Sequence, residues 1–452
     1  MSIFIPRPVQ RVATTLLTLI LFCVMVNAPA HARFGIRDAE IEETLSLYAD
    51  NIFRVAGIPP GTARVFVLNN SDLNAFVSGG ANIFINTGLI GSTKTPNELI
   101  GVIAHETGHI AGGHLNRIKN AQADARIPLI FSVILAAAAA AAGAGDGAAA
   151  ILAGGAQIAQ RNVLSFSRNQ ESAADQAASS YLTATHQSLN GLFEVMETLA
   201  NQNIISRKIR NSYVFTHPLP RERRAALRDR AYRSPYTGVR DTAELQLRHD
   251  RMKAKLFGFL ENPALVLRRF PPENKSIPAR YARAVAYHHM TEDEKALAEI
   301  NSLIAEIPDD PYFYEVKGQI LFERGDITEA LISYRKARDL APSQPLIRIA
   351  LGQALVASGQ KKFIQEGVKE LSLGMKVERE YASGWYSLAI GYDRLENPGQ
   401  AQLATAERFL LIGRKADALV QAKRARDKLE TGTPGWLRAN DIASLPSPKK
   451  TN

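Results

Sequence analysis

The sequence has 452 residues, a formal net charge of +10 and a single cysteine. This length predicts about two to four domains and allows a sizeable hydrophobic core. No zinc-finger spacing, RNA-binding motif or long basic helix accompanies the positive charge, so the sequence argues against nucleic acid as a partner.

The first segment, residues 1–32, has the three parts of a secretory signal peptide. Arg7 and Arg11 precede an apolar run, and a small-x-small cleavage site ends at Ala32. An uncleaved anchor is the alternative, but the run is shorter than the roughly 20 residues of a membrane span. We therefore expect a cleaved, periplasmic protein. Its only cysteine, Cys23, lies in the removed segment, which excludes disulfide bonds.

The next segment, residues 33–239, predicts a mostly helical α+β domain. Residues 38–58 have the apolar spacing of an amphipathic helix, and residues 64–68 and 82–86 have the pattern of strands. A turn-rich stretch that contains Gly79-Gly80 joins the two strands.

A helix with an H-E-x-x-H motif follows the second strand. Its start has the order of a capping box with proline at the first helical position, in Thr95, Pro96 and Glu98. His105 and His109 are one helical turn apart, so both imidazole rings face the same side and can bind one zinc ion. Glu106 lies between them, where it can accept a proton from the attacking water, as in zinc proteases.

An unusual insertion, residues 127–159, follows the motif helix. Residues 127–142 are uncharged and almost wholly apolar, a glycine-rich turn comes next, and residues 148–159 are again small and apolar. We interpret the insertion as a helical hairpin that covers the active site or rests on a membrane surface. A transmembrane span is the alternative, although the run is marginal in length.

A third zinc ligand has to come from outside the motif. Metzincins use a histidine shortly after it, but that position holds Leu115. His114 lies about 140° around the helix from His109 and is interpreted as polar surface or as support for a ligand. The next glutamate is Glu171, one turn before Asp175 on the same helix face. One of this acidic pair could bind metal while the other orients a histidine, or both could be solvated.

The stretch from residue 201 to 276 is strongly basic, with 17 Lys and Arg against 7 Asp and Glu. Solvated helix faces explain such a stretch, but it could also make peripheral contact with anionic lipid head groups or an acidic partner.

The C-terminal half repeats with the period of tetratricopeptide repeats. Prolines and glycines recur 34 residues apart in the pairs Pro308 and Pro342, Pro311 and Pro345, Gly318 and Gly352, and Gly325 and Gly359. We predict an α-helical repeat domain at residues 278–430, a helical connector at 240–277 and a tail at 431–452. Stacked helix pairs form a concave surface that binds peptide or protein partners.

In combination, these motifs resemble the HtpX/Ste-type gluzincin peptidases. The resemblance is carried by Asn74-Ala75-Phe76, by Asn82 to Leu89, by Ala104 to His109 and by Glu171 to Asp175. With the export signal and the repeats, the sequence is most similar to the BepA-like periplasmic metalloproteases of Gram-negative bacteria. The similarity is strong over residues 38–230 and extends to the C-terminal half in architecture only.

The resemblance implies a zincin-type protease that holds one zinc ion through His105, His109 and Glu171. It implies Glu106 as the catalytic base, supported by Asp175. It also implies that substrate pairs, as an added strand, with an edge strand made of Asn82, Ile83, Phe84, Ile85 and Asn86.

Related proteases also carry a His-Pro that can approach the zinc, here His217. This histidine could be a regulatory fourth ligand, an oxyanion stabiliser or simply polar surface.

We therefore expect a zinc endopeptidase of the cell envelope. By resemblance, its substrates are misassembled outer-membrane proteins, and its repeats dock on the outer-membrane protein assembly machinery. The alternative is a non-enzymatic chaperone or adaptor in which the repeats bind and the metal is structural. Glu106 favours the enzyme, because a structural metal site needs no base.

Overall fold

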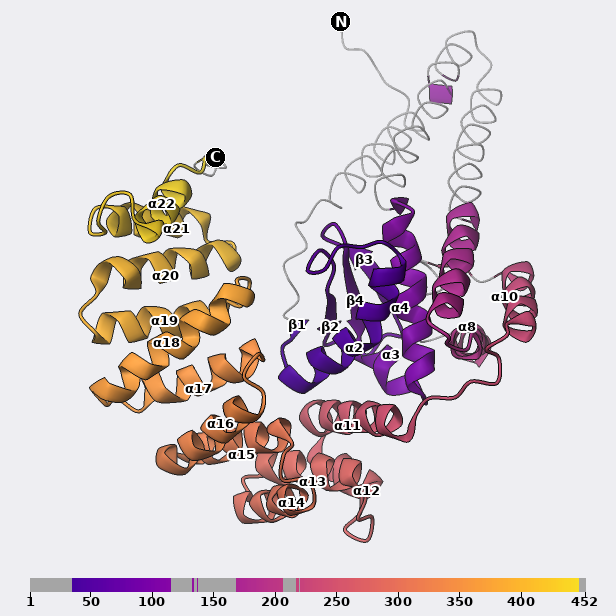
Figure 1. Ribbon diagram of the computed structural model, residues 1–452, viewed down its shortest axis with the longest axis horizontal. Helices are drawn as coiled ribbons and strands as arrows, with labels where there is room; N and C mark the ends of the chain where they lie inside the picture. Colours follow the sequence, from indigo (N-terminus) through magenta and orange to yellow (C-terminus); the bar gives the residue numbers. More distant parts are fainter. Residues whose placement is uncertain are drawn as a thin grey trace, which may run out of the picture.

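The computed structural model describes residues 35–114, 132–133, 136, 168–205, 217–218 and 220–446. The predicted signal peptide lies outside these residues, as does the predicted apolar hairpin except for positions 132, 133 and 136. A mostly helical α+β domain is followed by a curved array of helices (Figure 1), which confirms the predicted fold class. In the described part of the chain, no helix is both long enough and apolar enough to cross a membrane.

The small sheet has four strands in the order β1-β2-β4-β3. The strands are β1 Gly35–Ile36, β2 Val65–Leu68, β3 Ala75–Ser78 and β4 Asn82–Asn86. β2 and β4 pair in parallel and correspond to the two predicted strands. β1 and β3 were not predicted, because β1 has only two residues and only Phe76 and Val77 of β3 favour a strand. They pair antiparallel with β2 and β4, respectively.

The predicted edge strand is an inner strand of the sheet. The prediction was wrong for all of its residues, Asn82, Ile83, Phe84, Ile85 and Asn86, which form β4 between β2 and β3. Ile83, Phe84 and Ile85 each have one partner residue on β2 and another on β3. Ile83 and Ile85 are also fully buried in the core. The backbone of β4 therefore pairs within the sheet and is closed to an added strand.

Two glycines explain why β4 has a neighbour on this side. Gly79 and Gly80 take positive φ angles of 59° and 95°, which let the chain fold back so that β3 covers the edge of β4. The outer strand on this side of the sheet is therefore β3, which lies in contact with α4 (Pro96–Ala111).

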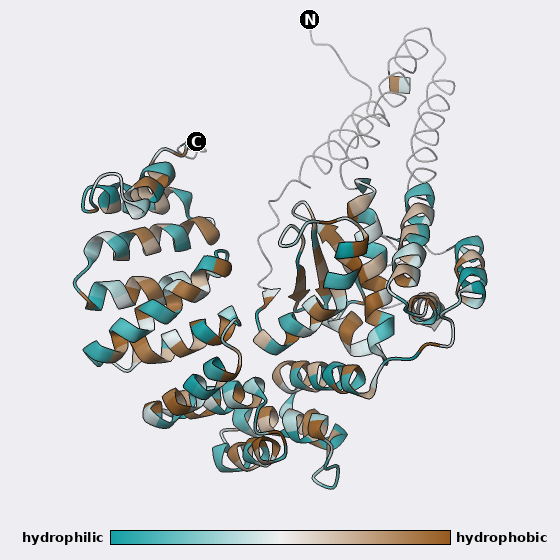
Figure 2. Ribbon diagram, viewed as in Figure 1, coloured by the Kyte–Doolittle hydropathy of each residue, from teal (hydrophilic) through white to brown (hydrophobic). Residues whose placement is uncertain are grey.

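Side-chain caps begin two of the helices around the sheet, and the one at Thr95 was predicted. α2 (Ala39–Val55) begins after Asp38, whose carboxylate accepts hydrogen bonds from two first-turn amides. α4 begins after Thr95, whose hydroxyl accepts a hydrogen bond from the Glu98 amide at 3.3 Å. α3 (Thr87–Ser92) connects β4 to α4. The strands and the inner sides of these helices are hydrophobic (Figure 2) and share one core.

Further helices complete the first domain and lead to the repeats. Residues 168–184 are helical, and they are followed by α8 (Asn190–Ile205) and α10 (Arg221–Arg233). The predicted connector contains α11 (Ala243–Leu260) and α12 (Pro263–Arg269). α11 contacts α2, α3 and α4 as well as the first repeat helix, so it belongs to both halves of the protein.

The repeat half is a stack of helix pairs. Its helices are α13 Ile277–His289, α14 Asp293–Glu306, α15 Pro311–Arg324, α16 Ile327–Leu340, α17 Pro345–Ala357, α18 Lys361–Val377, α19 Ala382–Arg394, α20 Pro398–Leu411, α21 Lys415–Arg426 and α22 Pro434–Ala443. The recurring prolines Pro311 and Pro345 are the first residues of α15 and α17. A Cβ at Gly318 would lie 2.9 Å from the Tyr334 ring, so the recurring glycine permits close packing of α15 on α16.

The C-terminal helix lies inside the segment that we predicted as a tail. Thr433 caps α22, and Pro434 occupies its first position. Ala439 and Ile442 are buried with residues of α20 and α21, so the helical array continues to Ala443. The burial of these two side chains explains why this part of the segment is ordered as a helix.

The two halves meet at the first turn of α2. Arg37 and Arg64 both form ion pairs with Glu378, which follows α18, and the Arg64 contact measures 2.7 Å. Arg37 also lies over the Tyr381 ring, 5.1 Å from its centroid. Ala39 is buried in the apolar cluster of the repeats, so the start of α2 packs against the stacked helices.

Candidate metal centre and active site

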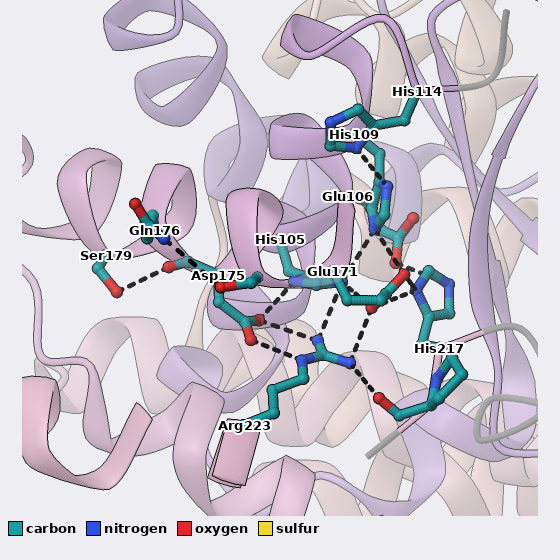
Figure 3. Close-up of polar contacts among 12 residues, drawn as sticks. His105, Glu106, His109, His114, Glu171, Asp175, Gln176, Ser179, His217 and Arg223 are labelled. Carbon is teal, nitrogen blue, oxygen red and sulfur yellow. Dashed lines mark hydrogen bonds and ion pairs between the residues drawn. The ribbon is translucent and has the colours of Figure 1, made fainter. Parts of the chain in front are cut away.

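The two histidines of the motif point to one spot from the same face of α4. The Nε2 atoms of His105 and His109 lie 3.1 Å apart, and both side chains are buried (Figure 3). The one-turn spacing places both rings on the same side of the helix, as the sequence predicts.

The helix of residues 168–184 supplies two carboxylates from the opposite side. Glu171 approaches His105 Nε2 at 3.4 Å and His109 Nε2 at 3.3 Å. Gly108 allows this approach, because a Cβ there would lie 2.9 Å from the Ala174 carbonyl oxygen. The glycine inside the motif therefore sets the distance between the two helices that carry the cluster.

The Nδ1 atoms of the two histidines also have partners. His105 Nδ1 lies 2.9 Å from Asp175 Oδ1, and His109 Nδ1 lies 2.9 Å from His114 Nδ1. A proton held on each Nδ1 leaves the Nε2 lone pair available for a metal. Asp175 and His114 are thus placed to orient the two rings.

His217 joins the cluster from the loop before α10. Its Nδ1 lies 3.1 and 3.2 Å from the two oxygens of Glu171, and its Nε2 lies 3.6 Å from Glu106 Oε1. One ligand atom from each of His105, His109, Glu171 and His217 falls within a set no wider than 4.8 Å.

These four buried side chains could hold a metal ion. Three imidazole nitrogens and one carboxylate oxygen are ligand types that suit zinc, which prefers four ligands in a tetrahedron. Both carboxylate oxygens of Glu106 are buried and have no hydrogen-bond partner among the described residues. A carboxylate in this setting is suited to bind a water molecule or a substrate at the same site.

Arg223 is a site residue that our sequence analysis missed. It extends from α10 into the cluster, where its Nε and Nη2 contact the Asp175 carboxylate at 2.6 and 2.9 Å. Its Nη1 lies 2.8 Å from Glu171 and donates a hydrogen bond to the Pro218 carbonyl at 2.9 Å. In the sequence Arg223 is one of many arginines in a basic stretch, and nothing local distinguishes it.

His114 is the second residue whose role depends on the structure. In a helix that continued through this position, His114 would face away from His109. Instead α4 ends at Ala111, and Gly113 takes a φ of +62°. The ring folds back toward Gly112, where a Cβ would lie 2.4 Å from His114 Nε2.

Burial and close charges shift the pKa values of the cluster. Burial alone would raise the pKa of Glu171, but His217 and hydrogen bonds from His105 and His109 hold it far below its ordinary value. Burial would also raise the pKa of Asp175, but hydrogen bonds from Arg223 and His105 lower it to about 2. Both carboxylates are therefore ionised at neutral pH, as metal binding and support of a ligand require.

The pKa values of the two motif histidines shift in opposite directions. Burial lowers the pKa of His109, which favours the neutral ring that a metal needs. For His105, burial acts downward as well, but Asp175 and Glu171 outweigh it and raise the pKa to about 9. A metal that binds His105 would therefore release a proton from this ring.

Residues 36–231, which include the whole cluster, match peptidase family M48. The chain carries an M48 metallopeptidase domain. Residues 318–359 match a tetratricopeptide repeat, which agrees with the helix pairs of the C-terminal half. The M48 domain makes proteins or peptides the substrates, and repeats of this type are protein-interaction surfaces.

Curated relatives are similar to this chain across both of its halves. The chain is 25% identical over 375 residues to the "Beta-barrel assembly-enhancing protease" of Escherichia coli K12, covering 81% of this chain and 75% of the relative. It is 24% identical over 378 residues to the protein of the same name from Yersinia pestis, with the same shares covered.

We predict that Gly108→Ala weakens metal binding by the M48 domain, because the added Cβ must push the helix of residues 168–184 away from α4. Zinc affinity, measured by competition with a chromophoric chelator, should fall by about tenfold or more. Alanine is the better helix former, so poor helicity cannot explain a loss. The control is Gly91→Ala in α3, where a Cβ meets no atom within 4 Å. Unchanged zinc affinity in Gly108→Ala would show that the helix spacing does not set the site.

Proposed function

We propose that the protein is a zinc endopeptidase in which His105, His109 and Glu171 hold the ion. The observation that carries this proposal is the convergence of two Nε2 atoms and one carboxylate beside Glu106, whose oxygens have no hydrogen-bond partner among the described residues. Zinc, when bound, would polarise the scissile carbonyl and lower the pKa of water at the site.

In this mechanism Glu106 moves the proton. Its carboxylate accepts a proton from the attacking water and then transfers it to the nitrogen of the leaving amine. Asp175 and His114 keep the two ligand rings oriented through their Nδ1 atoms. Arg223 offsets part of the buried charge of Asp175 and Glu171.

We expect Glu106→Gln to retain zinc but to lose peptidase activity by at least about a hundredfold, because an amide cannot accept the proton. Cleavage of fluorescein-labelled casein and zinc content by elemental analysis measure the two effects. The matched control is Glu98→Gln in the same helix, whose oxygen can still accept the hydrogen bond from the Lys94 amide. Glu171→Gln should instead lower zinc content. Casein cleavage by Glu106→Gln at the wild-type rate would reject this mechanism.

We propose that β3, rather than β4, aligns the substrate. The Asn86 amide donates to the Asn74 carbonyl at 2.9 Å, and hydrogen-bonded pairs alternate along antiparallel strands. The backbone groups of Ala75 and Val77 therefore point to the open side of the sheet. An extended peptide could pair with them beside α4.

Val77→Pro tests this role, because it removes one outward amide and leaves the pairing with β4 intact. Casein cleavage should fall about three- to tenfold, the effect of one lost hydrogen bond or somewhat more. Val77→Ala removes side-chain atoms but keeps the amide, and its activity should stay close to wild type. If both variants behave alike while their melting temperatures match, β3 does not pair with substrate.

In the cell, we propose that the protease is periplasmic and acts on misassembled outer-membrane proteins. The names of the relatives and the predicted export signal support this assignment. The repeats offer a cavity of about 780 Å³ between α18, α19, α20 and α22, with Trp385, Leu388 and Tyr392 in its lining. Such a cavity suits a segment of the outer-membrane assembly machinery.

We propose that His217 closes the site at rest. Its ring lies within the set of possible ligands, and a fourth protein ligand would fill the position that a catalytic zinc site keeps open. Pro218 and Pro220 restrict the loop, so it would move as a unit when a substrate or partner binds. The alternative role, stabilisation of the oxyanion, requires His217 to stay beside the substrate.

The two roles of His217 predict opposite changes in proteolytic activity when the histidine is removed. We expect His217→Ala to raise basal casein cleavage about tenfold, on the order of the inverse of the open fraction at rest. The control is His289→Ala in α13, away from the cluster. A fall in activity at unchanged zinc content would assign His217 to oxyanion stabilisation, and no change would remove it from the mechanism.

A further inference from the structure

Three phenylalanine rings form a stack across the sheet, on the face that turns away from the core. Phe66 of β2 and Phe76 of β3 are the two cross-strand neighbours of Phe84 on β4. The ring centroids of Phe66 and Phe84 lie 5.4 Å apart, as do those of Phe76 and Phe84. Side chains alternate along a strand, so these rings lie on the opposite face from the buried Ile83 and Ile85. All three rings are only half-buried, so part of this aromatic surface is open to water.

The last ring of the stack belongs to the strand that we propose pairs with substrate. Phe76 lies between Ala75 and Val77, whose backbone groups point to the open side of the sheet. An antiparallel peptide strand that pairs with these groups places one of its residues directly opposite Phe76, in a pair that exchanges no hydrogen bonds. Side chains of directly opposite residues lie close together, with about 4.5–5.5 Å between their Cβ atoms. One substrate side chain would therefore extend the stack by one strand.

An aromatic substrate side chain gains most at this position. Aromatic rings attract one another at centroid distances of about 4.5–7 Å, and the stack already has such a spacing. Phe84 packs against Phe76 from the inner side, so the outer ring offers a supported surface. Strands of outer-membrane barrels carry girdles of aromatic residues, so such side chains are frequent in the proposed substrates.

We propose that Phe76 is a specificity-determining residue, which selects polypeptide segments with an aromatic side chain at one fixed position relative to the cut bond. This inference rests on the proposed pairing of substrate with β3.

Two simpler roles of the ring make different predictions. If Phe76 only stabilises the sheet, its removal affects all peptides alike and resembles the removal of Phe66 from the other side of Phe84. If Phe76 is only a general apolar surface, aliphatic and aromatic substrate side chains are accepted equally well.

The test uses the full-length zinc-loaded protein and a library of unstructured synthetic peptides, in which each residue type occurs at each position. Mass spectrometry identifies the cut bonds. We expect aromatic residues to be enriched at one fixed position from the cut, and we expect Phe76→Ala to reduce this enrichment about fivefold, the effect of one lost aromatic contact. Phe66→Ala is the matched control, because it removes a ring at the same distance from Phe84 but two strands away from the substrate. It should keep the wild-type enrichment.

A second pair of variants changes the chemistry of the same position. Phe76→Lys should shift the preference there from aromatic to acidic residues, because opposite charges attract across neighbouring strands. Phe76→Tyr should keep the aromatic preference.

Unchanged enrichment in Phe76→Ala would overturn the proposal, as would an equal loss in Phe66→Ala at matched melting temperatures or equal acceptance of aliphatic residues by the wild type. The proposed function fails in a distinguishable way. Absence of cleavage by the wild type would reject the peptidase, and cleavage by Val77→Pro at the wild-type rate would reject the pairing with β3. In either case the specificity role of Phe76 is rejected as well.

Discussion

The site depends on keeping two ionised carboxylates away from water. Glu171 is 3% exposed and Asp175 is 2% exposed, and a buried charge without a partner costs several kcal/mol, on the order of the whole stability of a domain. The protein compensates with donors from three segments, the motif helix α4, Arg223 of α10 and His217 of the loop before it. The motif histidines reach the carboxylates only because Gly108 lets the two ligand-bearing helices approach closely. His217 also helps to hold the pKa of Glu171 low, so its departure would raise the pKa of a proposed ligand as well as open access to it.

The sequence predicted the parts of this arrangement that follow from local periodicity. Helical spacing was sufficient to place His105 beside His109 and Glu171 on the same face as Asp175. It was not sufficient for Arg223, which reaches Asp175 from 48 positions away in the sequence, or for His114, whose position depends on a left-handed glycine. β3 was missed for a similar reason, and β4 was mistaken for an edge as a result. Only Phe76 and Val77 of its four residues favour a strand, and pairing with β4 defines the segment as one.

The junction between the first domain and the repeats also contains buried charges that are paired. Lys255 of α11 is 1% exposed and lies 2.8 Å from Asp38, 3.5 Å from Glu40 and 3.6 Å from Glu315 of α15. The first two acids belong to the start of α2, and the third belongs to the repeats. Separation of the repeats from this junction would leave Glu315 without Lys255 and Glu378 without Arg37 and Arg64, so these ion pairs hold the repeats against the first domain.

This fixed junction has a consequence for the sheet. Arg37 directly follows β1 and Arg64 directly precedes β2, and both bind Glu378 of the repeats. The hydrogen-bonded order β1-β2-β4-β3 then leads without a break from that contact to the outer strand beside α4. The repeats thus contact one edge of the sheet, and the proposed substrate strand β3 forms the other edge. A partner seated on the repeats would be held in a defined orientation toward the active site, because α11 and the ion pairs of Glu378 join the two halves in the described part of the chain.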